Sequence, residues 1–331
     1  MPLVPPRISR RHALRALVAV LVVLGALVWW LRPFGEPELK GDLVFSTGVR
    51  TGVYHRYGQL LQPELARDMP GVDVRLETSE GSQQNLQRVA AGEADFTVAT
   101  ADAVAKYRLD GKPGAERLRG CARLYDDYVQ LVVPAGSPVQ SAQDLRGKRV
   151  AVGQDGSGVR LISERLLTAA KLDPHRDVVP VSIGIDTMPT ELQAGRIDAF
   201  FWSGGLPTNA VRELSERFEI RLVQLGDLVE QLQAGGSPAR YYRAAVMPQD
   251  AYARARNTSS VATLAVPNLL VTREDTGAEL TEQFTRTVIL SRDRIGHEVH
   301  AAQLVDLRTA IYTDPLDLHE GAMRYYRSVK P

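Results

Sequence analysis

The chain of 331 residues has one cysteine, Cys121, and almost no net charge. A single cysteine excludes an intramolecular disulfide and any zinc or iron–sulfur site built from several cysteines. The formal net charge is +1, whereas nucleic-acid-binding proteins typically have a clear excess of basic residues. We therefore expect no nucleic-acid partner.

Motifs of catalysis and cofactor binding are missing as well. The sequence has no nucleophile elbow, no metalloprotease helix motif and no Walker sequence. His297 and His300 flank Glu298 and could share a metal ion at one helical turn, but no third ligand lies nearby. Two surface histidines are the simpler interpretation. From the sequence we therefore expect a protein that is not an enzyme and that binds no metal and no cofactor.

The N-terminus carries a basic and then apolar pattern. Four arginines lie within the first 15 residues, and an unbroken apolar run then begins at Ala16 and ends at Leu31. This order is typical of export signals and membrane anchors. No small-x-small cleavage site follows, so we expect residues 1–34 to form a retained anchor with a cytoplasmic N-terminus. A cleaved signal peptide is the alternative. Residues 35–41 read as a linker.

The rest of the chain contains one pattern twice. An apolar strand at 43–46 is followed by a glycine-spaced loop and a helical pattern, and a strand at 149–153 is followed by the same succession. Each unit then reaches a matching phrase, Ala-Gly-Glu-Ala-Asp in the first and Ala-Gly-Arg-Ile-Asp in the second. The repeat predicts two similar α/β lobes.

We expect the chain to pass from the first lobe to the second and later back to the first. Apolar strands at 128–134 and 261–271 are the expected crossings. They assign residues 42–131 and 263–331 to lobe 1 and residues 132–262 to lobe 2. Ligands of open α/β folds collect at the carboxyl ends of the strands, so two opposed lobes predict a cleft between them.

The glycine loops are the strongest candidates for ligand binding. A strand–loop–helix junction exposes unpaired N–H groups and the positive end of a helix dipole, which suit a carboxylate or a phosphate. Other polar groups lie where strands end and helices start. Ser82 and Asp102 could be helix caps only, and Arg50 could be a solvated loop residue. The candidates from this argument are Gly48, Arg50, Thr51, Tyr54, Ser82, Asn85, Thr100, Asp102, Gly156, Ser157, Gly158 and Ser203.

These residues give the chain a family resemblance. From about Gly41 onward it resembles the TAXI group of solute-binding proteins, the extracytoplasmic receptors of one class of TRAP transporters. The ordered phrases that carry the resemblance are Thr47-Gly48 with Gly52 and Tyr54, Gly81-Ser82 with Asn85, Gly92-Glu93-Ala94-Asp95, the run from Asp144 to Val150, Gly156-Ser157-Gly158, and Gly195 with Ile197-Asp198-Ala199-Phe200.

The resemblance implies a fold and a site. It implies a two-lobed, periplasmic-binding-protein-like fold of type II, with an α/β sandwich in each lobe and a hinge between them. It also implies a small anionic solute such as glutamate, glutamine or a dicarboxylate. By position, the implied contacts are Thr47, Tyr54, Ser82, Asn85, Thr100, Asp102 and Ser157.

The chain departs from that group at four positions. Val49, Val53, Ala101 and Val159 stand where the group often has a small hydroxyl residue, which predicts a more apolar pocket. We predict a membrane-anchored, extracytoplasmic binder that captures a small carboxylate-bearing solute, an amino acid or a dicarboxylate, for TRAP membrane subunits. A membrane-anchored sensor that signals to a kinase is the alternative, and an enzyme on the same fold is a third possibility.

Overall fold

The computed structural model describes residues 10–31 and 39–329, in two compact parts, Met1–Lys40 and Gly41–Pro331. The first part contains one helix, α1 (Arg10–Leu31). Among the described residues, no helix combines the length and the apolar content that a membrane span needs. The membrane anchor expected from the sequence is not confirmed and stays a prediction.

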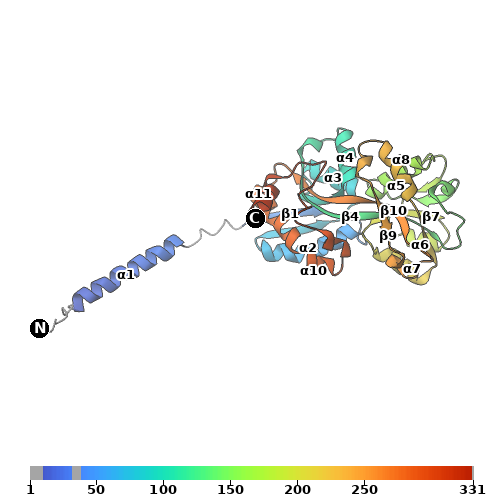
Figure 1. The fold of residues 1–331 in the computed structure, drawn as a ribbon. Helices are drawn as coiled ribbons and strands as arrows, with labels where there is room; N and C mark the ends of the chain where they lie inside the picture. The colour runs from blue at the N-terminus through green and yellow to red at the C-terminus, as the bar shows by residue number, and fades with distance from the viewer. Residues whose placement is uncertain (1–9, 32–38, 330–331) are drawn as a thin grey trace. The chain divides into compact units, whose positions relative to one another are not determined.

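The second part begins with a lobe in which parallel strands alternate with helices (Figure 1). Its repeating elements are β1 (Gly41–Ser46), α2 (Val53–Asp68), β2 (Val72–Glu77), α3 (Ser82–Ala91), β3 (Phe96–Thr100) and α4 (Ala101–Leu109). Every residue of β3 is buried, as expected for a strand covered on both faces. The last helices of the chain complete this lobe, namely α9 (Ala278–Leu290), α10 (Arg292–Gly296) and α11 (Glu320–Val329). Phe284 of α9 stacks on Phe96 with ring centroids 4.1 Å apart.

The second lobe repeats the alternation. Its elements are β5 (Arg149–Ala151), α5 (Gly158–Ala169), β6 (Val179–Val181), α6 (Met188–Gln193), β7 (Ala199–Gly204), α7 (Asn209–Arg217), β8 (Ile220–Val223), α8 (Val229–Ala234) and β9 (Arg243–Met247). Its apolar side chains belong to one continuous core that includes Phe200, Phe201 and Leu166.

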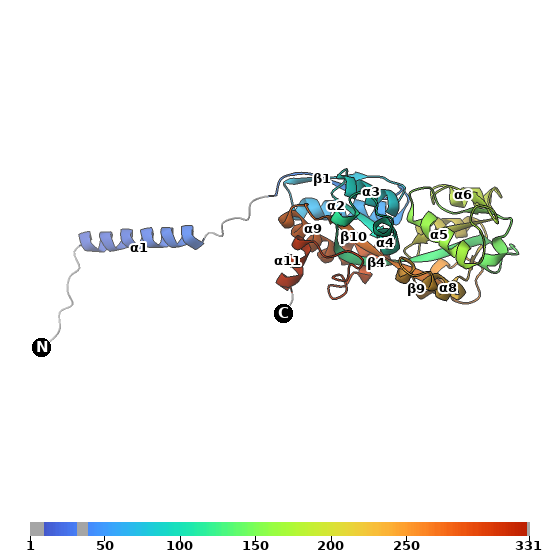
Figure 2. The same ribbon diagram turned by 90° about the horizontal axis from the view of Figure 1, so that it is seen from above.

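Two long strands join the lobes, β4 (Leu118–Pro134) and β10 (Val261–Arg273). Figure 2 shows both running from one lobe into the other. They contain the predicted crossings at 128–134 and 261–271, but β4 begins ten residues before the predicted strand. The exact division of the chain into 42–131 with 263–331 and 132–262 stays a prediction.

The two lobes have the same strand order. In the first, β1 lies between β2 and β3 in parallel, then β10 and β4 follow in antiparallel pairing. In the second, β5 lies between β6 and β7 in parallel, then β4 and β8 follow in antiparallel pairing. The fourth strand of each lobe therefore arrives from the other lobe, and the predicted two-lobed α/β fold is confirmed.

The matching Asp95 and Asp198 occupy equivalent places. The Val44 N–H donates to Asp95 Oδ2 at 2.8 Å, and the Arg149 N–H donates to Asp198 Oδ2 at 2.8 Å. In each pair the backbone N–H of the aspartate also donates back to the strand carbonyl. Each carboxylate thus links the turn before one strand to the neighbouring strand.

We predict that Asp95→Ala lowers the free energy of unfolding by about 1 to 3 kcal/mol, because a hydrogen bond to a charged group is lost and the Val44 N–H is left unpaired. Urea denaturation measures the change. Glu93→Ala, at an exposed acidic residue two positions earlier, is the matched control and should change stability by less than about 0.5 kcal/mol. Equal effects of the two changes would contradict the role of Asp95.

Candidate functional site

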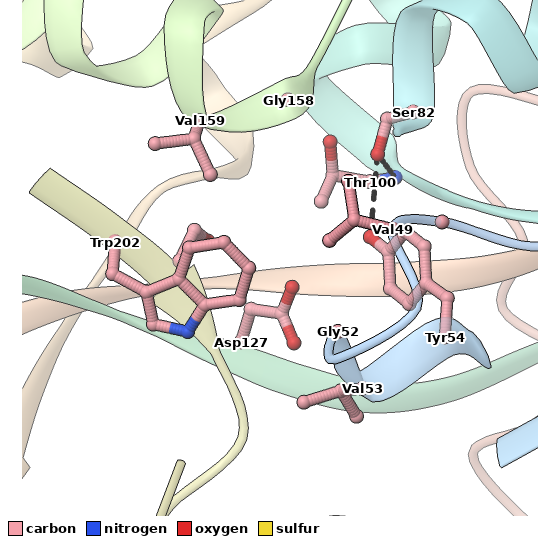
Figure 3. Close-up of a pocket in the computed structure, with 12 residues that line it drawn as sticks. Val49, Gly52, Val53, Tyr54, Ser82, Thr100, Asp127, Gly158, Val159 and Trp202 are labelled. Carbon is pink, nitrogen blue, oxygen red and sulfur yellow. Dashed lines mark hydrogen bonds between the residues drawn. The ribbon is translucent and has the colours of Figure 1, made fainter. Parts of the chain in front are cut away.

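A small cavity of about 50 Å³ lies between the lobes (Figure 3). Its volume is about three to five times what one water molecule needs. Loops, helix starts and strands of both lobes supply its walls. The lining residues are Gly48, Val49, Gly52, Val53, Tyr54, Ser82, Thr100, Asp127, Gly158, Val159, Trp202 and Ser203.

Four helices begin at this cavity. The residues that precede them are Gly52 for α2, Gly81 for α3, Thr100 for α4 and Ser157 for α5. Only Ser157 accepts a capping hydrogen bond on its side chain, from the Arg160 N–H. The other three helix starts keep backbone N–H groups without a side-chain cap, and the positive ends of their dipoles favour an anion.

A hydrogen-bonded group of side chains forms the first-lobe wall. The Tyr54 hydroxyl donates to Asn268 Oδ1 at 2.5 Å and lies 3.2 Å from Ser82 Oγ, which accepts from the Thr100 N–H at 3.2 Å. Burial, with the Asp127 carboxylate nearby, raises the pKa of Tyr54 well above its usual value. Tyr54 is therefore a neutral phenol whose proton is donated to Asn268.

Asn268 reaches this wall because β10 is irregular there. The pairing of β10 with β4 shifts register between Pro267 and Leu269, and Asn268 pairs with Thr100 of β3 instead. Bulges of this kind redirect side chains beside functional sites. The Asn268 Nδ2 is buried without a partner among the described residues.

Asp127 is the one ionisable carboxylate among the residues that line the cavity. It lies on β4, it is 3% exposed, and its Oδ1 has no hydrogen-bond partner in the described part of the chain. Burial raises the pKa of Asp127 to about 7, while the neighbouring Asn268 amide opposes that rise. Asp126 differs, because Arg123 lies 2.5 Å and Arg243 lies 3.1 Å from its carboxylate.

The second-lobe wall comes from the end of β7. The Trp202 Nε1–H donates to Thr208 Oγ1 at 3.1 Å, so the polar edge of the indole is satisfied while its ring lines the cavity. In Figure 3 the Asp127 carboxylate points into the space between the Trp202 and Tyr54 rings. Ser203 Oγ and Thr100 Oγ1 are buried without partners among the described residues.

The structure brings six of the thirteen predicted site residues to the cavity. These six are Gly48, Tyr54, Ser82, Thr100, Gly158 and Ser203. Of the four apolar departures from the resemblance, Val49, Val53 and Val159 line the cavity as well. The sequence reasoning missed Asp127 and Trp202.

Two predicted residues lie behind the cavity wall. Thr47 is fully buried, and its Oγ1 donates to the Glu77 carbonyl at 2.9 Å. Asn85 is fully buried too, where its Oδ1 accepts from Ser46 Oγ and Ser79 Oγ at 2.7 Å each. Both side chains hold the first-lobe loops in place. Neither lines the cavity, and their contact with a ligand stays a prediction.

The remaining predicted residues lie at the contact between lobes or at its rim. Asp102 Oδ2 accepts from the Tyr242 hydroxyl at 2.6 Å and lies 3.5 Å from Arg165 Nη1. The Ser157 carbonyl accepts from Gln83 Nε2 at 2.7 Å. The sites at the rim are Gly156, whose carbonyl accepts from the Gln84 N–H at 3.0 Å, Thr51, which hydrogen-bonds Asp186, and Arg50, which is exposed.

Glycine allows the two lobes to approach this closely. Gly81 has φ +129°, and a Cβ there would lie 3.3 Å from the Ser157 Cα across the contact. A Cβ at Gly158 would lie 3.1 Å from Ser82 Oγ. Larger residues at these two positions would push the lobes apart, so the glycines allow the cavity to be closed.

We predict that Asp127 contributes a loss of stability that grows as the pH rises from about 4 to about 7, because folded Asp127 keeps a proton that the unfolded chain has lost. Asp127→Asn removes this loss. Its advantage over the wild type should grow across that window to a few kcal/mol, since each pH unit is worth about 1.4 kcal/mol. Urea denaturation at both ends of the window measures the difference, and a gap that does not change with pH would contradict the prediction.

Known structures share this architecture. An ancestral arginine-binding protein bound to arginine aligns with a TM-score of 0.52 and 15% identity, over 78% of this chain and 98% of that chain. A protein of Listeria monocytogenes described as an L-cystine ABC transporter aligns with a TM-score of 0.50 and 14% identity, over 81% and 99%. At these identities the likeness shows the fold alone, that of two-lobed periplasmic binding proteins. The NMT1-like family model matches residues 45–329, and the chain belongs to that family.

Proposed function

We propose that this chain is an extracytoplasmic solute-binding protein that captures a small carboxylate-bearing solute between its lobes and performs no catalysis. The cavity carries this proposal. It is closed by both lobes, four helices begin at it, and two of its hydroxyl oxygens, on Thr100 and Ser203, are buried without partners in the described structure. Buried polar groups without partners cost stability, so a ligand that pairs with them is favoured.

A carboxylate fits the first-lobe end of the cavity. The helices α2, α3 and α4 begin beside this cavity without a side-chain cap, so the positive ends of their dipoles favour an anion there. The Thr100 hydroxyl, which has no partner among the described residues, adds a donor at the same wall. We assign the primary contacts to the six predicted residues that line the cavity.

Capture would proceed by closure of the lobes. The crossing strands β4 and β10 provide the hinge, and contacts between lobes hold the closed form. The buried bond from Tyr242 to Asp102, with Arg165 beside it, is one such contact. In this proposal Asp102 stabilises the closed form. Gly156 and Ser157 form the edge of the second lobe that contacts the first lobe.

The proposal for which membrane protein receives the solute rests on the resemblance to the TAXI receptors. TRAP membrane subunits are the proposed partners, because the ordered loop phrases resemble the TAXI receptors. A sensor that passes closure to a kinase would use the same cleft. The arginines and the apolar run from Ala16 to Leu31 support a proposed anchor with the binding lobes outside the cell membrane.

Replacing Thr100 by Val should change solute affinity and the stability of the ligand-free protein in opposite directions. The change removes a buried, unpartnered hydroxyl at similar volume, so the ligand-free protein should gain up to about 1 kcal/mol. Affinity for the solute should fall by about 2- to 13-fold, because a neutral hydrogen bond is worth roughly 0.5–1.5 kcal/mol. A thermal-shift screen of carboxylates and isothermal titration of the binders measure both.

His297→Ala and His300→Ala are the controls, since both histidines are exposed. Neither change should alter affinity. Unchanged affinity in Thr100→Val, or loss of binding in the histidine variants, would place the solute outside this cavity.

The anchor has its own test. Full-length protein expressed natively should sediment with membranes and keep its N-terminal residues, because the apolar run is not followed by a cleavage site. Deletion of residues 1–34 should release it. A native mature chain that starts near Gly35 would show that the segment is a cleaved signal instead.

A further inference from the structure

We propose that the captured solute carries an ammonium group beside its carboxylate, and that Asp127 is the counter-ion of that ammonium group. This inference rests on the proposed function and narrows the class of solute to small aminocarboxylates. It separates them from the dicarboxylates, which the helix starts alone would accept equally well.

The first argument is an uncompensated charge. None of the twelve residues that line the cavity is a lysine, an arginine or a histidine. Asp127 is 3% exposed with an unpartnered Oδ1, whereas its neighbour Asp126 has Arg123 and Arg243 beside it. A buried carboxylate without a cation is costly, so the empty site favours the protonated carboxyl, and a cation that entered the cavity would favour the ionised form.

The surroundings of Asp127 sharpen this point. The charged groups that act on it are the acidic Asp126 and Asp102, and the ionisable groups that it acts on are the phenols of Tyr54 and Tyr125. With burial, the two acidic groups raise the pKa of Asp127, and only the Asn268 amide opposes them. An arriving ammonium group would reverse the balance and hold Asp127 ionised.

The second argument is the aromatic wall. Trp202 lines the same cavity with its Nε1–H already bonded to Thr208, so the ring is the surface it offers. Indole is the best aromatic partner for a cation, and such contacts strengthen when water is excluded. The Asp127 carboxylate and the Trp202 indole line the same cavity and together suit an ammonium group (Figure 3).

The cavity divides into two ends. The start of α4, with the Thr100 hydroxyl that has no partner among the described residues, supplies donors for a carboxylate, while Asp127 and Trp202 suit an ammonium group. A dicarboxylate would place its second charge against Asp127, and like charges in a buried site repel strongly. The volume of about 50 Å³ restricts the solute to a few heavy atoms in this closed form.

The experiment uses matched pairs of small solutes. Glycine, L-alanine, β-alanine and γ-aminobutyrate are each titrated beside the acid that lacks the amino group (acetate, propionate and butyrate), with succinate and fumarate as dicarboxylates. Full-length protein is titrated calorimetrically at about pH 8, above the pKa near 7 of ligand-free Asp127. At least one amino acid should bind, and its deaminated partner should bind at least about 30-fold more weakly.

Variants test the residue itself. Asp127→Asn should weaken the amino acid by at least about 30-fold and should not weaken the deaminated acid, because only the ammonium group loses its counter-ion. Asp126→Asn, one position along β4 and with its own arginines, is the matched control and should keep wild-type affinity. The comparison of solutes on the wild type needs no variant, so it decides the question even where Asp127→Asn misfolds.

Each outcome decides one claim. Binding of dicarboxylates or deaminated acids as tightly as amino acids, with Asp127→Asn unchanged or tighter, overturns the ammonium site and leaves the proposed function standing. Binding of no solute in the panel overturns the carboxylate-binding function, and the ammonium site falls with it. Preference for an amino acid that depends on Asp127 and not on Asp126 supports both.

Discussion

The antiparallel pairing of β4 and β10 is the constraint on which the rest of this molecule depends. Each strand begins in one lobe and ends in the other, so the fourth strand of each sheet belongs to both lobes. The lobes therefore cannot separate beyond what these two strands allow. On these strands Asp127 lines the cavity between the lobes, and Asn268 lies beside it.

The buried polar groups of the cavity suit a bound solute as their hydrogen-bond partner. The other buried carboxylate of the described structure, Asp102, has an arginine near it, because its Oδ2 lies 3.5 Å from Arg165 Nη1 and accepts from the Tyr242 hydroxyl. In the cavity, Asp127, Thr100 and Ser203 each have a buried oxygen that finds no partner in the described part of the chain. Such groups lower the stability of the empty protein, and functional sites are where proteins tolerate that cost. The same groups that weaken the fold would thus provide the binding energy.

Much of the fold could be predicted from local patterns. The repeated strand, glycine loop, helix and aspartate phrase correspond to two lobes with the same strand order, and Asp95 and Asp198 make equivalent bonds. The first half of β4 was missed. Aspartates are rare in strands, so the pair Asp126-Asp127 reads as the end of an element rather than its middle. The predicted strand began at Tyr128, one residue after the carboxylate that lines the cavity.

The sequence by itself determined the two lobes, the loops at which helices begin and six of the residues around the cavity. These follow from glycine spacing and hydrophobic periodicity, which act over a few residues. Only the tertiary structure decided that Asn85 and Thr47 support the wall, that Asp102 bridges the lobes, and that Asp127 faces Trp202 without a cation. The physical reason is that charge compensation depends on which side of a strand a residue faces and on what crosses from the other lobe. Asp126 and Asp127 are neighbours in the chain, yet β4 turns one towards two arginines and the other towards an empty space.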